Sequence, residues 1–158
     1  MSEIFEGVLA ASDPGQLRRA LQPVSPRVPL SVEALSGVSV AYRTDPRESA
    51  AYSAELDRIA GELSRALGEA LLVRYDSRVG HRSSVLYKGG TAVRSFGEAD
   101  ELYIRLGERG YPVQDGERLR PDQLSEDEEY ETALNAIQLG LQVLGRGDWV
   151  ALHELMTR

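Results

Sequence analysis

The dipeptide Gly89-Gly90 constrains the fold more than any other feature of the sequence. It separates two short segments, residues 84–88 and 91–96, that contain mostly β-branched, aromatic and alternating polar residues. A two-residue hairpin loop of the primed type requires positive φ values, which glycine adopts without strain. The pattern predicts a hairpin in which Lys88 faces Thr91, Tyr87 faces Ala92, Leu86 faces Val93 and Val85 faces Arg94.

Further strands are expected at residues 38–42, 71–75 and 101–106, which places an antiparallel β-meander of four to five strands in the middle of the chain. Both sides of the predicted hairpin are partly apolar, whereas a sheet with one solvated face alternates cleanly. The meander is therefore expected to be covered on both faces, in part by helices and for the rest by a second subunit or a ligand.

Capping signals predict helices before the meander. Residues 46–70 follow Asp45, have proline at the first position and glutamate three residues after the cap, and show apolar residues at steps of three and four. A shorter helix is expected at residues 14–21, after the cap Asp13. Residues 4–9 have helical spacing as well.

Two helices are expected after the meander. Ser125 and Glu128 form the pattern of a capping box, so a helix is predicted over residues 126–144, ending at Gly145. Its apolar stripe would pack within its own domain or, as a second option, form a dimer interface. The last helix is expected at residues 149–156, after Asp148.

Together these elements predict an α+β fold in which the meander packs with one long helix before it and two helices after it. The length of 158 residues favours a single domain, residues 1–158. Two loop-rich connectors interrupt the pattern, a proline-rich one at residues 22–36 and a glycine-rich one at residues 107–124.

Composition excludes several kinds of chemistry. The chain has no cysteine, which excludes disulfides, thiolate nucleophiles and iron–sulfur clusters. His81 and His153 are the only histidines, and no known catalytic or phosphate-loop motif occurs, so neither a metal nor a cofactor is expected. The acidic N-terminus and the absence of a long apolar run argue against a signal peptide or a membrane span, so a cytoplasmic location is expected.

The segment 74–84 is the first candidate site. Arginines, hydroxyls and a histidine are concentrated there between two predicted strands, and such residues can bind a phosphate or carboxylate group. The candidates for binding an anion or a partner are Arg74, Asp76, Arg78, His81, Arg82 and Ser83. In a catalytic variant, Asp76 would orient His81 as a general base. The alternative is a polar connector in which Asp76 caps its own turn and binds Arg78.

The second candidate site is an acidic run. Its residues are Glu126, Asp127, Glu128 and Glu129. They could form a docking surface for a basic protein partner, or they could simply favour a helix N-terminus. A metal site is less well supported, because the spacing does not match a calcium-binding loop.

Three functions follow from these features. The first is a non-enzymatic binding or regulatory protein that acts through protein–protein contacts or self-association, for example an adaptor, a chaperone-like factor or an immunity-type protein. The second is an enzyme or binding domain for an anionic small molecule at segment 74–84. The third is nucleic-acid binding by a sheet face that contains Arg74, Lys88, Arg94, Arg105 and Tyr103. The net charge of −7 argues against the third function, and the missing catalytic motifs favour the first.

Overall fold

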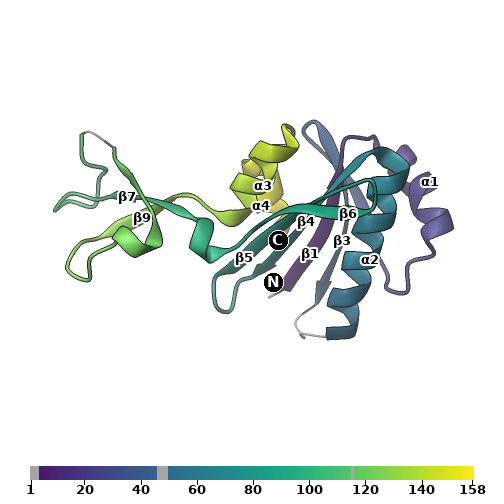
Figure 1. Cartoon of the computed structure of the whole chain (residues 1–158), viewed down its shortest axis with the longest axis horizontal. Helices are drawn as coiled ribbons and strands as arrows, with labels where there is room; N and C mark the ends of the chain where they lie inside the picture. Colours follow the sequence, from purple (N-terminus) through teal and green to yellow (C-terminus); the bar gives the residue numbers. More distant parts are fainter. Residues whose placement is uncertain (1–3, 46–49, 115) are drawn as a thin grey trace.

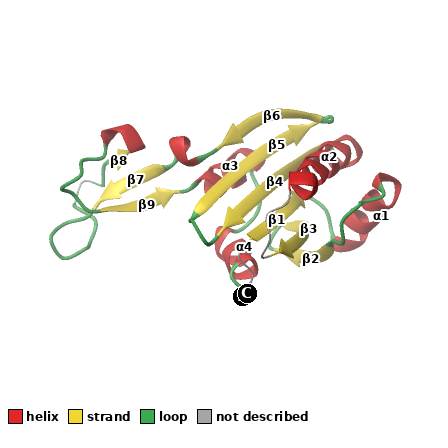
Figure 2. Cartoon of the chain, turned by 90° about the horizontal axis from the view of Figure 1, so that it is seen from below, coloured by secondary structure: helices red, strands yellow, loops and turns green. Residues whose placement is uncertain are grey.

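The computed structural model describes residues 4–45, 50–114 and 116–158, which form two antiparallel sheets and four α-helices (Figures 1 and 2). The larger sheet has the strand order β2-β3-β1-β4-β5-β6, and the smaller has the order β8-β7-β9. The strands are β1 Ile4–Ala10, β2 Ser31–Leu35, β3 Val38–Asp45, β4 Glu69–Asp76, β5 His81–Lys88, β6 Thr91–Phe96, β7 Leu102–Arg105, β8 Arg118–Leu119 and β9 Tyr130–Leu134. The α-helices are α1 Pro14–Val24, α2 Ala50–Leu67, α3 Ala136–Leu144 and α4 Trp149–Met156.

Each face of the larger sheet carries its own apolar core. Helices α1 and α2 cover one face, where Leu17, Leu56 and Leu63 pack against Val8 and Leu72. Helices α3 and α4 cover the other face in a second apolar cluster (Figure 2). That cluster joins α3 and α4 to strands β1, β3, β4 and β5 through Phe5, Leu9, Val40, Leu71, Val73, Leu86, Ile137, Leu141, Leu152 and Met156. The six-stranded sheet with these four helices is called the body below.

The predicted α+β class is confirmed, with the long helix before the strands β4–β6 and two helices after them. Helix α1 begins at Pro14 after the cap Asp13, and α4 spans the predicted residues. The cap predicted at residues 45–48 lies largely outside the described residues, in which α2 begins at Ala50.

Two predicted helices were wrong in part or in whole. Residues 4–9, expected to be helical, form the central strand β1, which is buried along its whole length. Such a short apolar run fits a buried strand and a buried helix equally well. Of the helix predicted at residues 126–144, only residues 136–144 are helical, because Tyr130–Leu134 pairs with β7 as strand β9. The true N-cap is Asn135, whose side chain accepts hydrogen bonds from the backbone N–H groups of Ile137 and Gln138.

The predicted hairpin turn is confirmed, but its register holds for two pairs only. Gly89 and Gly90 have φ values of 56° and 90°, as the turn requires. Beyond the pair Tyr87 and Ala92 the register shifts, so that Leu86 faces Arg94 and not Val93. This bulge leaves Val93 53% exposed on the edge strand β6. The expected cover on both faces therefore holds for β4 and β5 and fails for most of β6.

The smaller sheet extends away from the body as a narrow projection (Figure 1). It comprises residues 102–134, which are called the arm below. The strand predicted at residues 101–106 is present as β7, but it belongs to the arm and not to the larger sheet. The two predicted connectors also contain strands, since β2 lies within residues 22–36 and β8 within residues 107–124.

Candidate functional site

The residues predicted in segment 74–84 lie on opposite faces of the sheet. Strand β4 pairs with β5 so that Arg74 faces Ser83 and Asp76 faces His81. Residues that face each other across strands share a side of the sheet, so these four lie on the side covered by α2. Arg82 faces Tyr75 and lies on the other side, which α3 and α4 cover. The segment therefore does not form one convergent cluster.

Internal partners engage the charged groups of this segment. Both oxygens of Asp76 accept hydrogen bonds from the Arg78 side chain, at 3.0 and 2.8 Å. This bond to Arg78 is the main reason that the pKa of Asp76 lies below its usual range. His81 Nδ1 lies 3.0 Å from Glu98 Oε1, so the carboxylate that hydrogen-bonds this imidazole is Glu98, whereas the predicted Asp76 bonds to Arg78.

Arg82 anchors the joint between the body and the arm. Its guanidinium donates two hydrogen bonds of 3.1 Å to Glu101, whose side chain is almost fully buried. Glu101 also accepts the backbone N–H of Ala136 at 2.9 Å, in the first turn of α3. The chain thus leaves the body after Glu101 and returns at Ala136, and the buried Glu101 carboxylate ties the two points together by accepting the Ala136 N–H while it pairs with Arg82.

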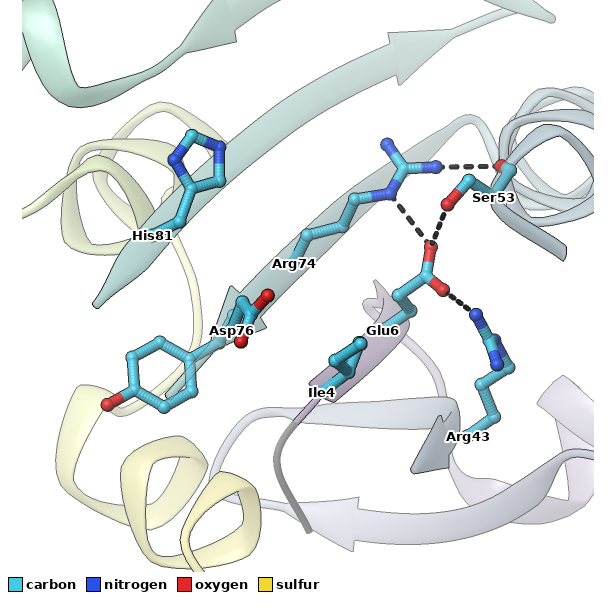
Figure 3. Close-up of a pocket in the computed structure, with 8 residues that line it drawn as sticks. Ile4, Glu6, Arg43, Ser53, Arg74, Asp76 and His81 are labelled. Carbon is cyan, nitrogen blue, oxygen red and sulfur yellow. Dashed lines mark hydrogen bonds and ion pairs between the residues drawn. The ribbon is translucent and has the colours of Figure 1, made fainter. Parts of the chain in front are cut away.

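The strongest polar cluster of the body was missed in the sequence. Glu6 lies at the centre of the larger sheet and is only 2% exposed. Its direct neighbours across the two adjacent strands are Arg43 on β3 and Arg74 on β4. Both guanidinium groups donate to its carboxylate, Arg74 at 2.8 Å, and Ser53 of α2 adds a hydrogen bond at 3.3 Å (Figure 3). The two arginines therefore compensate the negative charge of Glu6, which would otherwise be costly to bury.

This cluster extends to α2 and β5. Arg74 also donates to the Ser53 carbonyl oxygen at 2.7 Å and to Asp57 at 3.2 Å. Burial alone would lower the pKa of the Arg74 guanidinium, but its bonds to Glu6 and Asp57 raise it overall. Burial and a hydrogen bond to Asp57 raise the pKa of Tyr87 to about 12. Neither group can act as a base near neutral pH.

A small cavity lies beside the Glu6 cluster. Its volume is about 90 Å³, and Arg43, Arg74, Asp76 and His81 contribute to its lining (Figure 3). Ligand pockets for small molecules usually measure about 300–1,000 Å³. The cavity therefore has room for a few waters or a very small anion, and Glu6 in its wall opposes an anion. This arrangement fits a structural ion cluster better than a substrate site.

The residues of the predicted nucleic-acid face do not form one surface. Arg74 is inside the body, and Lys88 pairs with Glu69 at 3.2 Å. Arg94 lies over the ring of Phe96, 4.9 Å from its centroid. Arg105 and Tyr103 are on the arm, where Arg105 pairs with Glu128 at 2.8 Å. The five side chains are divided between two sheets.

The predicted acidic run is on the arm, in the turn that precedes β9. All four residues are exposed: Glu126, Asp127, Glu128 and Glu129. The arm as a whole contains nine acidic and four basic residues, so it carries a net charge of −5 out of the chain's −7. Among its described residues only Leu119 is buried, while Tyr111 is 71% and Val113 is 41% exposed. The arm combines acidic charge with unburied apolar side chains.

Within residues 4–45, 50–114 and 116–158, no group of three or more His, Asp or Glu side chains is arranged to hold a metal ion. In the same part of the chain, no helix has both the length and the apolar character to cross a membrane.

Comparisons with protein-family models, with curated proteins and with solved structures gave no significant match. The function is therefore inferred from the geometry described above.

Proposed function

We propose that the chain is a non-enzymatic binding protein that recognises a basic protein partner through the arm. The arm supports this proposal because it extends from the body, concentrates the negative charge and buries one of its described residues. A three-stranded sheet without a substantial core is marginally stable unless something packs against it. A partner that covers Tyr111 and Val113 would supply that packing.

The charge of the arm favours a basic partner. Complementary charge speeds association and selects partners, and its contribution falls as salt screens it. The charged groups of segment 74–84 already bond to other residues of the chain. For this reason, binding of an anionic ligand or catalysis at that segment is less well supported than binding through the arm. With no cysteine in the chain, we place this binding in the cytoplasm.

Affinity capture with charge-reversed variants tests the proposal. The arm variant combines Glu126→Lys, Asp127→Lys and Glu129→Lys, and it retains Glu128 because that residue pairs with Arg105. The matched control reverses three acids of the body that are not buried, Glu62→Lys, Glu69→Lys and Glu154→Lys. The pairs of Glu62 with Arg65 and of Glu69 with Lys88 are solvent-exposed, so losing each costs about 1 kcal/mol or less. Proteins from the source cells should be retained by the wild type and the control, be released by raised salt and be lost with the arm variant. An identical set of captured proteins for all three would contradict the proposal.

A further inference from the structure

A groove at the end of the body opposite the arm has properties complementary to those of the arm. It has a volume of about 470 Å³ and lies between α1 and the segment that leads into the edge strand β2. Its lining is mainly apolar, with one guanidinium, and consists of Arg18, Leu21, Gln22, Pro26, Val28, Leu30 and Val32. The groove could therefore receive exposed apolar side chains that come with acidic neighbours.

The chain segments that form this groove are basic. Residues 14–32 contain Arg18, Arg19 and Arg27 and no acidic residue, in a chain whose overall charge is −7. All three arginines are exposed, and the Arg18 side chain reaches across the groove to the Val32 carbonyl oxygen at 3.4 Å. Because complementary charge favours association, a groove that is both basic and apolar favours an occupant with acidic and apolar side chains.

We propose that this groove binds the arm of a second copy of the chain. The arm provides both required properties, with exposed Tyr111 and Val113 and a net charge of −5. Figures 1 and 2 both place the arm and α1 at opposite ends of the molecule, so an arm cannot reach the groove of its own chain. The inference rests on the arm being a binding element, as proposed above, and identifies one of its partners.

Such a contact joins two different surfaces and is therefore head-to-tail. A contact of this kind leaves one arm and one groove open after each addition, so it produces rings or open chains of subunits. This property distinguishes it from a symmetric dimer, and it makes the mixing experiment below decisive.

Sedimentation with two neutralised variants tests the inference. The groove variant combines Arg18→Gln, Arg19→Gln and Arg27→Gln, and the arm variant combines Glu126→Gln, Asp127→Gln and Glu129→Gln. The full-length wild type should form species larger than a dimer as its concentration rises, and raised salt should dissociate them. Each variant alone should remain monomeric. An equimolar mixture should stop at two chains, because only one intact arm and one intact groove remain in each pair.

A matched control uses arginines away from the groove, Arg65→Gln, Arg94→Gln and Arg146→Gln, and should associate like the wild type. A wild type that stays monomeric at all concentrations overturns the inference, and so does association that survives in the groove variant. If the wild type is monomeric while the arm variant still loses captured partners, self-association is excluded and the proposed binding role of the arm stands. If the groove variant has an altered circular dichroism spectrum, Arg18→Glu alone replaces it, and this change should weaken association because Arg18 is the guanidinium in the groove lining.

Discussion

The body and the arm are built on opposite principles, although they are continuous in one chain. The body buries both faces of its inner strands β1, β3, β4 and β5 beneath helices, and its central ion cluster also has internal partners. Among its described residues the arm buries only Leu119, and it holds most of the net charge. The comparison teaches that stability and recognition are separated in space, so substitutions should affect one property or the other.

The largest effect is expected for Glu6→Ala in the body. Removing this carboxylate leaves Arg43 and Arg74 without their shared buried partner, and breaking a buried pair costs about 3–5 kcal/mol. The free energy of unfolding from denaturant titration measures the loss. Glu131→Ala on the exposed face of the arm is the control, with an expected change within about 0.5 kcal/mol. Equal losses at the two positions would remove the contrast between body and arm.

Gly140→Ala should destabilise the body next, although alanine favours helices. A Cβ atom at Gly140 would lie 2.3 Å from Ser84 Oγ and 2.7 Å from Ser84 Cβ, so α3 would be forced away from β5. Overpacking of this kind costs about 1–3 kcal/mol. Gly97→Ala, where no such atoms lie within 4 Å, should be nearly neutral in the same denaturant titration. A stabilised Gly140→Ala protein would show that the close packing of the body is not as described.

The end of the arm offers a test of where α3 begins. Asn135→Ala removes the side chain that caps the helix, and loss of an N-cap costs about 0.5–2 kcal/mol. Ser125→Ala changes the residue at which a cap was predicted from the sequence, and it should leave thermal stability unchanged because Ser125 lies before strand β9. A loss of stability for Ser125→Ala with no change for Asn135→Ala would instead support the predicted long helix over residues 126–144.

The smallest effect concerns acid stability. Hydrogen bonding by Arg58 lowers the pKa of Glu55 from 4.5 to about 2. A carboxyl group with a depressed pKa in the folded state stabilises fully above its unfolded pKa, and this contribution is lost as the pH falls from about 4.5 towards 2. Since Arg58 is 37% exposed, solvent screens the pair and the contribution is about 1 kcal/mol or less. Glu55→Gln should flatten the stability profile over this range, and Glu126→Gln should not. An unchanged profile for Glu55→Gln would contradict the assignment.

The sequence predicted those elements whose signals are local. The turn at Gly89-Gly90 follows from backbone sterics, and the starts of α1 and α4 follow from their capping residues. Strand β1 was misassigned because a short apolar run carries no period that separates a strand from a helix. Strand β9 was misassigned because Ser125 and Glu128 resemble a cap, while the pairing with β7 that decides the structure is a tertiary contact.

The candidate site was predictable only in part. The acidic run predicted as a docking surface or a helix start is exposed and does not begin a helix, and its place on a projecting arm depends on how the strands pair. The Glu6 cluster was missed because its charged members are far apart in the sequence and meet only through the strand order β3-β1-β4. Once β1 is recognised as a central strand, a glutamate within it is itself a signal that opposite charges must lie on the adjacent strands.

Excision of the arm tests the central claim most directly. Leu102 and Leu134 face each other across the base of the arm, so residues 103–133 can be replaced by the two-residue turn Asn-Gly. The shortened chain should unfold in one cooperative transition, with a free energy of unfolding within about 1 kcal/mol of the intact protein. It should also lose the captured partners and the concentration-dependent association. A shortened chain that cannot fold, or one that folds and still binds every partner, would contradict the separation of stability in the body from recognition by the arm.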